Sequence, residues 1–552
     1  MTLVGLADEL VDLIAEVDPL NVFLDGHPGF DDSLGDLSEA AEARQADRAR
    51  AIEAHARELA PAEREERITQ AVVLQQCEAL QTRLQARLVE HTLADFEVSP
   101  LARLFRALPR VSPADDERER NFLARLAAVP QLLAQSGDRH RAGIEAGRLA
   151  VRRRVEAAIA GIDDYLAERV PDPLLRPRLS PAGDSRRAEL IADRIRPALA
   201  TYRALLAEEV APAGRPDERP GLCWLPDGEA TYEALARMHT TTRRTPAELH
   251  AVGRELIAEI RQEYTALGME LVGLRGMREV LVKLQSDPAL RWRDGEQILA
   301  AARDALARAE EVAPRWFGRI PTARCAVAAV PEAEAPSASA AYYVPAALDG
   351  SRPGTYYANT YKATERDRSL AETTAFHEGV PGHHFQISLA QTLDGLPQLR
   401  RVAWINAYLE GWALYSERLA DEIGLFSSPV GRLGMLSNEL MRAARLVVDT
   451  GLHAFGWTRE QSIDYLRTNT AMSEVEVVEE TDRYIEMPGQ ALAYMTGRIE
   501  FERLRKEAET ALGSAFDVRA FHDLVLGSGP VPLDVLSGIV ADWTTRVGSQ
   551  GA

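Results

Sequence analysis

The first half of the chain carries apolar residues at helical spacing. In segments such as ITQAVVLQQCEALQTRLQARLVEH and RVEAAIAGIDDYLAERV, apolar positions recur three or four residues apart, as on the buried face of a helix. Proline-rich stretches separate these segments and indicate loops. In TPAE, a capping residue, Thr245, precedes a proline and a glutamate in the first turn, which predicts a long helix that reaches about Met269.

A different pattern occupies residues 320–361. The segments RCAVAAVP, SAAYYVPA and GTYYANTY are short, rich in aromatic or β-branched residues, and separated by Pro, Gly, Asp and Ser. They predict a small antiparallel sheet of about three strands, with residues 348–354 as a tight connection. After Ser369 the helical pattern returns. The chain is therefore predicted to be mostly α, with helical regions at 1–319 and 362–552 on either side of the sheet in one continuous architecture.

Composition and charge narrow the classes of function. With 552 residues, of which 46% are apolar, the chain can bury a large core, and its net charge of -20 disfavours nucleic acid and anionic membranes as partners. The N-terminal segment lacks the basic start and unbroken apolar stretch of a signal peptide, so we expect a cytoplasmic protein without a membrane partner. The three cysteines, Cys77, Cys223 and Cys325, lie far apart. Any metal must therefore be held by histidine and carboxylate.

Three of the eleven histidines, His377, His383 and His384, fall within the segment FHEGVPGHHFQ. Residues 369–372 resemble a capping box and predict the start of this helix. In the zinc motif His-Glu-x-x-His, two histidines one turn apart share the metal, and the glutamate polarises its water. Here Pro381 occupies the position of the second histidine. In an unbroken helix, neither later histidine could share a metal with the first.

A local bulge would restore the motif. If Pro381 and Gly382 form a two-residue insertion, His383 returns to a position one turn after His377. The alternative is a kinked helix whose histidines are only solvated or capped. Downstream, WINAYLEGWALYSERLADEIG places Glu410 and Glu417 two turns apart on one helix face.

The motifs AFHEGVPGHHFQ, YLEGWALYSE and PGQALAYMTGRIEFERLR resemble the bacterial domain-of-unknown-function family 885. That family is similar to the carboxypeptidase Taq zinc metallopeptidases. The resemblance covers most of the chain and implies a large helical metallopeptidase-like fold with a deep cleft, one wall of which is formed by residues 1–319, and a Zn²⁺ cofactor. It implies the metal ligands His377, His383 and Glu410, and Glu378 as general base.

Two neighbours of the predicted ligands have open roles. His384 is an alternative to His383 as the second histidine ligand, because the Pro-Gly insertion leaves the register of the helix undefined. Glu417 would either orient a ligand histidine or be a plain surface charge.

A polar stripe runs along the helix LMRAARLVVDTGLHAFGW. Arg442, Arg445, Asp449 and His453 recur there at intervals of three or four residues in an otherwise apolar segment. Such a stripe must face either a polar cavity or its own ion-pair partners. In the first case, Asp449 would fix the tautomer of His453, which would then donate to the developing oxyanion.

Further candidates flank the cleft. Tyr484 is the first choice for the oxyanion donor, because a tyrosine hydroxyl can complement the zinc in peptide hydrolysis. The strands before the zinc helix could provide a sheet edge to which an extended peptide adds itself. The remaining substrate-binding candidates are Arg483, Tyr494 and Arg498 after the helical stripe, and Tyr356, Tyr357 and Asn359 in the strands.

These features together predict a zinc-dependent metallopeptidase, more specifically a carboxypeptidase of short peptides. A buried zinc site admits narrow, extended substrates, and Arg483 or Arg498 would bind their terminal carboxylate. The same site could instead hydrolyse a non-peptide amide or ester. A non-catalytic binding protein could also retain the fold, although the glutamate beside His377 argues against it, because a structural zinc site needs no base.

Overall fold

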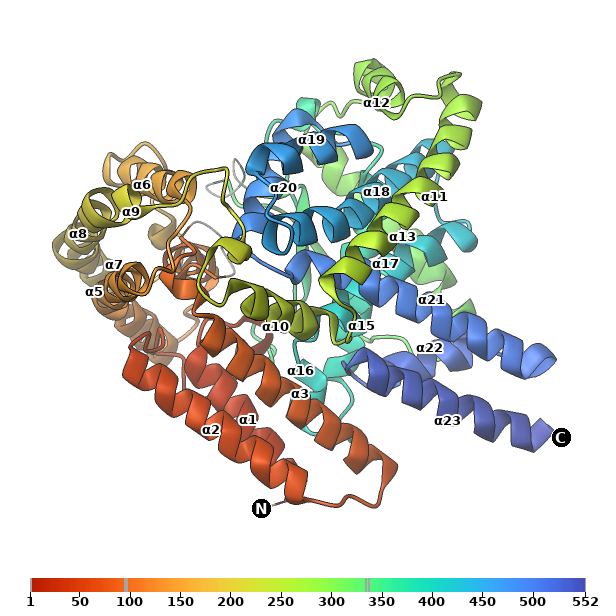
Figure 1. The fold of residues 1–552 in the computed structure, drawn as a ribbon, viewed down its shortest axis with the longest axis horizontal. Coiled ribbons are helices and arrows are strands. Elements are labelled where there is room, and N and C mark those ends of the chain that lie inside the picture. The colour runs from red at the N-terminus through yellow and green to blue at the C-terminus, as the bar shows by residue number, and fades with distance from the viewer. Residues whose placement is uncertain (1, 94–97, 333–334, 336–337, 552) are drawn as a thin grey trace.

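The computed structural model describes residues 2–93, 98–332, 335 and 338–551, and most of them are helical (Figure 1). Three long helices at the lower left of Figure 1 pack against one another and begin the chain. They are α1 (Leu3–Val17), α2 (Glu39–Glu58) and α3 (Arg64–Ala86). The mostly α fold predicted from the sequence is confirmed.

A helical lobe follows at the upper left of Figure 1. It consists of α4 (Pro100–Ala107), α5 (Asp116–Glu145), α6 (Arg152–Leu166), α7 (Pro181–Leu190), α8 (Arg196–Leu205) and α9 (Ala211–Ala213). The last three form one continuous helix interrupted by two π-helical turns. The lobe has an apolar core of its own, to which Leu126, Leu199 and Leu206 belong.

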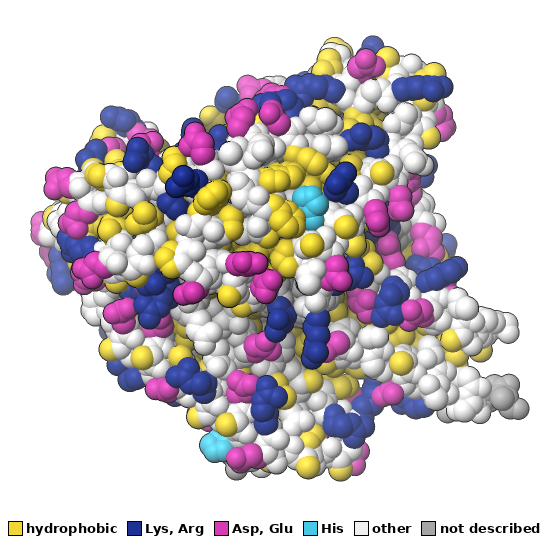
Figure 2. Space-filling model, in the orientation of Figure 1, with side chains coloured by type: hydrophobic (Ala, Val, Ile, Leu, Met, Phe, Trp, Pro, Cys, Tyr) yellow, Lys and Arg dark blue, Asp and Glu magenta, His cyan; other side chains and the backbone are white. Residues whose placement is uncertain are grey.

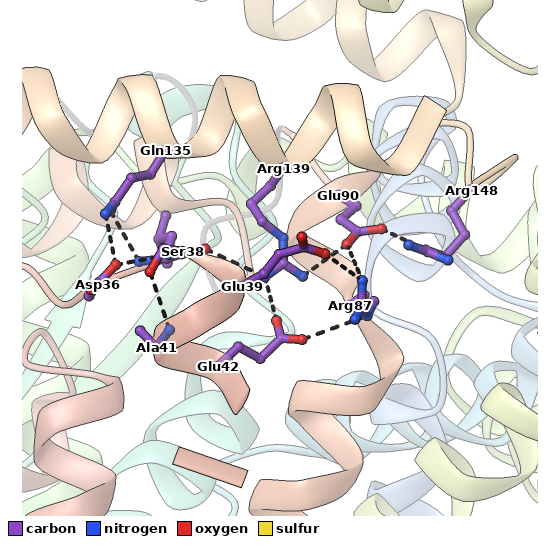
Figure 3. Close-up of polar contacts among 11 residues, drawn as sticks. Asp36, Ser38, Glu39, Ala41, Glu42, Arg87, Glu90, Gln135, Arg139 and Arg148 are labelled. Atoms are coloured by element: carbon purple, nitrogen blue, oxygen red, sulfur yellow. Dashed lines mark hydrogen bonds and ion pairs between the residues drawn. The ribbon is translucent and has the colours of Figure 1, made fainter. Parts of the chain in front are cut away.

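A buried carboxylate, Glu90, joins this lobe to the first helices (Figure 3). Its Oε1 accepts hydrogen bonds from Nη2 of Arg139 at 2.9 Å and from Nη1 of Arg87 at 3.3 Å. Its Oε2 accepts from Nε of Arg148 at 2.6 Å. Arg139 also donates to Glu42 on α2 at 2.5 Å. Both oxygens of this carboxylate are therefore satisfied by guanidinium donors.

The second half of the chain packs around two large apolar cores. The helices before the sheet are α10 (Gly228–Thr240), α11 (Pro246–Val272), α12 (Met277–Ser286) and α13 (Gly295–Val312). Those after it are α14 (Ala371–Glu378), α15 (His383–Gln391), α16 (Gln398–Val402), α17 (Asn406–Glu422), α18 (Pro429–His453), α19 (Arg459–Asn469), α20 (Glu474–Glu486), α21 (Ala493–Leu512), α22 (Val518–Gly527) and α23 (Leu533–Gly551). Each core mixes side chains from the two predicted helical regions, so the regions do not have separate interiors.

Local signals account for several helix boundaries. The capping box at Thr245 and Glu248 is present, and α11 runs from Pro246 to Val272, close to the predicted span. The capping box predicted at residues 369–372 is absent. The Ser369 hydroxyl donates to Asp367 at 2.8 Å instead, and α14 begins at Ala371 without a side-chain cap.

The three predicted strands are present, but their pairing differs from the prediction. They are β1 (Ala326–Ala329), β2 (Ala341–Val344) and β3 (Thr355–Ala358), in the order β1-β3-β2. β2 pairs antiparallel with β3 as predicted, whereas β1 pairs parallel with β3. The prediction of a wholly antiparallel sheet is wrong, because β3 lies between the other two strands and β1 runs in the same direction as β3.

Two glycines set the distance between α17 and α21. A Cβ on Gly411 would lie 2.5 Å from backbone atoms of Gly497, so only residues without side chains fit at this crossing. Gly411 directly follows Glu410, and the close crossing therefore fixes the position of that carboxylate. On the face shown in Figure 2, basic and acidic side chains are interspersed and do not form separate fields.

Candidate metal centre

The predicted zinc helix is divided into two helices. α14 ends at Glu378, α15 begins at His383, and the residues between them contain a cis Val380–Pro381 peptide. A Cβ on Gly382 would lie 1.9 Å from the His377 carbonyl oxygen, so the connection folds tightly against the first histidine. The predicted two-residue bulge in a continuing helix is wrong, because four residues leave the helical path.

Contacts with α17 fix this connection. The indole Nε1 of Trp412 donates to the Pro381 carbonyl at 2.9 Å, and the Ser416 hydroxyl donates to the same oxygen at 3.3 Å. Since Glu410 lies on the same helix, α17 positions both the start of α15 and one of the predicted ligands.

Two imidazoles and one carboxylate converge beside this connection. Nε2 of His377 lies 3.5 Å from Oε2 of Glu410, and Nε2 of His383 lies 3.3 Å from the same oxygen. One potential ligand atom from each residue lies within 4.8 Å of those of the other two. The buried Oε2 of Glu410 has no hydrogen bond of good geometry. Two histidines and one carboxylate form a ligand set typical of catalytic zinc, and these residues fit such an ion.

The electrostatics of the three residues favour a cation. Burial opposes the charged form of His377, but the carboxylates of Glu410 and Glu417 outweigh it and raise the pKa of His377 to about 9. Burial also opposes ionisation of Glu410, yet His383 and His377 hold its pKa well below the ordinary value. The carboxylates that attract a proton to His377 would equally attract a metal ion.

Glu417 and Thr373 fix the orientation of His377. Nδ1 of His377 donates to Oε1 of Glu417 at 2.7 Å, and the Thr373 hydroxyl donates to Oε2 of the same carboxylate at 2.7 Å. In the neutral ring that a metal ligand requires, the free lone pair would therefore be on Nε2, which faces Glu410. The role of Thr373 was missed, although its position four residues before His377 on one helix was a usable signal.

His384 has other partners. Its Nε2 donates to the Ala323 carbonyl at 3.0 Å, and its Nδ1 accepts from the Tyr343 hydroxyl at 3.1 Å. Both ring nitrogens are thus used in contacts with the sheet and with the segment before it. The structure therefore brings His383, and not His384, to His377 and Glu410.

A cavity of about 1030 Å³ opens beside the converging residues. Glu378 lines it, and burial raises the pKa of this carboxyl while His377 and His383 oppose the shift. Residues of α1, α3 and α4 also line this cavity. Of the predicted substrate-binding residues, those that line the cavity are Tyr356, Asn359, Arg483 and Tyr494.

Tyr484 and His453 do not lie in this cavity, which corrects their predicted catalytic roles. The Tyr484 hydroxyl donates to Glu480 and accepts from Nε of Arg445 at 3.0 Å. Nδ1 of His453 accepts from the Leu222 amide at 3.1 Å, and its Nε2 donates to the Tyr484 carbonyl at 2.9 Å. Burial lowers the pKa of His453 to about 4, so the imidazole is neutral and structural.

The predicted hydrogen bond between Asp449 and His453 is absent. Asp449 instead accepts from the Tyr232 hydroxyl at 2.5 Å and from the Gly489 amide at 3.1 Å. The polar stripe on α18 therefore divides: Arg442 and Arg445 line the cavity, whereas Asp449 and His453 lie in the interior beyond it.

Arg498 and Tyr357 also lie away from the predicted subsite. Arg498 is buried and pairs with Glu439 at 2.6 Å and with Glu502 at 2.8 Å. Tyr357 stacks on Tyr342 and is not among the residues that line the cavity. Because β3 is the central strand, its two edges are already paired and cannot accept a peptide.

Comparison with known proteins gives the family. A family model described as "Bacterial protein of unknown function (DUF885)" matches residues 19–540. The chain belongs to this DUF885 family. No curated protein matches the chain.

Two solved structures resemble the whole DUF885 chain. One is described as "the putative lipoprotein from Colwellia psychrerythraea"; it is 25% identical, with a TM-score of 0.91 and 99% of each chain covered. The other, "a putative lipoprotein of unknown function from Shewanella oneidensis", is 18% identical, with a TM-score of 0.72, and the match covers 98% of this chain and 100% of that one. None of these descriptions refers to carboxypeptidase Taq, so that resemblance stays a hypothesis.

The expected cytoplasmic location is contradicted by these neighbours. Both are named as lipoproteins, a class whose members are anchored to membranes, and the expectation is withdrawn on this finding. In the part of the chain that the structure describes, no helix is both long and apolar enough to cross a bilayer.

Proposed function

We propose that this DUF885 protein is a zinc-dependent peptidase that acts on short, extended peptides. The observation that carries the proposal is the convergence of His377, His383 and Glu410 beside a cavity that Glu378 also lines. A bound zinc ion would supply a water of lowered pKa and polarise the carbonyl of the substrate.

Glu378 is suited to act as the general base. It follows the ligand His377 directly in the sequence, and burial raises the pKa of its carboxyl, which makes the carboxylate a stronger base. It would take a proton from the attacking water and deliver it to the nitrogen of the leaving amine. Glu417 would meanwhile keep the His377 ring in the orientation that its hydrogen bond sets.

Tyr494 replaces Tyr484 as the donor to the substrate carbonyl oxygen. It lines the cavity, and Nε2 of Gln490 and Nη2 of Arg483 donate to its hydroxyl at 3.3 Å and 3.4 Å. Burial and the charge of Glu410 raise the pKa of Tyr494, so the hydroxyl keeps its proton and can donate it in a hydrogen bond.

The outer edge of β2 replaces β3 as the predicted binding edge for a peptide. Residues of β2 line the cavity, and β2 pairs with β3 on one side only. The backbone N–H of Asn359 donates to the Ala340 carbonyl. Because hydrogen-bonded and non-hydrogen-bonded pairs alternate along an antiparallel ladder, the backbone groups of Ala341 and Tyr343 face away from β3. Those of Tyr343 are suited to pair with an extended substrate.

The test is hydrolysis by zinc-loaded protein of a set of short peptides, together with amides and esters that contain no peptide bond. Peptide cleavage that stops when a chelator removes the metal and returns with zinc supports the proposal. Hydrolysis of esters or non-peptide amides alone would replace it with the alternative hydrolase. A zinc-loaded protein that cleaves none of these substrates would contradict catalysis.

A further inference from the structure

Arg442 lacks the acidic partner that its neighbours have. Its guanidinium lines the cavity, its Nε is buried without a hydrogen bond, and Nη1 contacts Sδ of Met441 at 3.6 Å. Among the described residues, no carboxylate oxygen lies within 4.0 Å of its nitrogens. A partly buried cation without such a partner is costly, unless a ligand supplies one.

The arginines near Arg442 on the wall formed by α18, α20 and α21 already have acidic partners. Arg445 pairs with Glu480 at 2.8 Å, and Arg483 lies 3.6 Å from the same carboxylate. Arg498, predicted from the sequence as a carboxylate ligand, is paired with two glutamates in the interior. Arg442 is therefore the guanidinium on this wall that is best placed to accept an anion from a substrate.

Arg442 also lies close to the converging residues. Its guanidinium carbon lies 5.5 Å from the centre of the Tyr494 ring, at the distance of a cation–π contact. Arg442 and Glu378 both line the cavity, and α18, which carries Arg442, packs against α14, which carries His377 and Glu378. The anion site is thus near the general base, where the end of a peptide cleaved close to its C-terminus would lie.

We infer that Arg442, held against Tyr494, binds the free C-terminal carboxylate of the substrate and makes the enzyme a carboxypeptidase. This inference rests on the proposed peptidase function and specifies its substrate class. The planar guanidinium can bind both oxygens of a carboxylate in a fork, with geometry that lysine cannot reproduce.

The experiment compares peptides with a free C-terminus and the same peptides with an amidated C-terminus. Arg442→Gln should lower kcat/KM for the free acids roughly 10- to 100-fold and leave the amides nearly unchanged. Arg442→Lys should retain part of the preference for the acid. The matched control is Arg352→Gln, which alters a cavity-lining guanidinium that already pairs with Asp25 at 2.7 Å and should leave the preference intact. Equal losses on acid and amide in Arg442→Gln would overturn the inference.

A binding measurement separates this inference from the peptidase proposal. In the background of Glu378→Gln, calorimetry with an N-acetylated tripeptide acid and its amide measures binding without turnover. A preference for the acid that disappears when Arg442→Gln is added supports the carboxylate site, even if no peptide is ever cleaved. Equal affinity for acid and amide, or a preference that survives Arg442→Gln, would overturn it, even if peptides are cleaved.

Discussion

Two buried glutamates, Glu90 and Glu410, illustrate how a structural charge cluster differs from a candidate metal site. Both side chains are largely removed from solvent. Three guanidiniums donate hydrogen bonds to the oxygens of Glu90 (Figure 3). Glu410, in contrast, faces two imidazole nitrogens at 3.3 Å and 3.5 Å, and its buried Oε2 has no hydrogen bond of good geometry.

The difference lies in the partners and not in the burial. Guanidinium groups carry only hydrogen-bond donors, so they satisfy the acceptor oxygens of a carboxylate and leave no ligand atom for a metal. Imidazole nitrogens with free lone pairs and a carboxylate oxygen are all electron donors, and their convergence leaves a place that a cation can fill. The first arrangement stabilises the fold; the second is suited to bind a metal.

The largest effect is expected from Glu378→Gln. The amide preserves the shape of the side chain but cannot accept a proton from water, so the rate of peptide hydrolysis should fall by roughly 10² to 10⁴. Zinc content and thermal stability should stay at wild-type values, since Glu378 is not one of the converging ligands. Near wild-type turnover by the purified variant would mean that Glu378 is not the base.

Glu90→Gln, unlike Glu378→Gln, should lower the stability of the fold. Removing the charge takes one carboxylate from the buried guanidinium of Arg139 and from the partly buried Arg87 and Arg148, so we expect a loss of about 3 kcal/mol in the free energy of unfolding. Chemical denaturation measures this loss, and zinc per folded chain should be unchanged. A Glu90 variant as stable as the wild type would contradict the claim that this charge cluster stabilises the fold.

Glu417→Gln should have an intermediate effect on the metal. The amide cannot provide the charge that faces Nδ1 of His377, so zinc affinity should fall roughly 10- to 100-fold. Competition with a chelator of known affinity measures this change. An unaltered affinity would place Glu417 with Glu90 as a structural residue.

Local sequence signals predicted much of the fold. The cap at Thr245 and the positions of the three strands depend on residues close together in the chain, and the structure has them where predicted. The resemblance to family 885 implied the grouping of His377, His383 and Glu410, and the structure brings these residues together through a break between two helices that was not predicted.

Features that depend on packing between distant elements were not predictable in this way. The parallel pairing of β1 depends on the insertion of β3 between the other strands. Helical spacing placed Arg442 and His453 on one stripe, but not the point at which that stripe leaves the cavity for the interior. Likewise, Tyr484 and Tyr494 lie close in sequence, and only the packing of α20 and α21 decides which of them lines the cavity.

Zinc content tests the central claim most directly. Elemental analysis of purified protein loaded with zinc and then dialysed should find about one zinc ion per chain in the wild type and in the Glu90→Gln control. His377→Ala and Glu410→Ala should each contain close to none. Unchanged zinc content in both ligand variants would contradict the assignment of the metal site, whatever the activity of the protein.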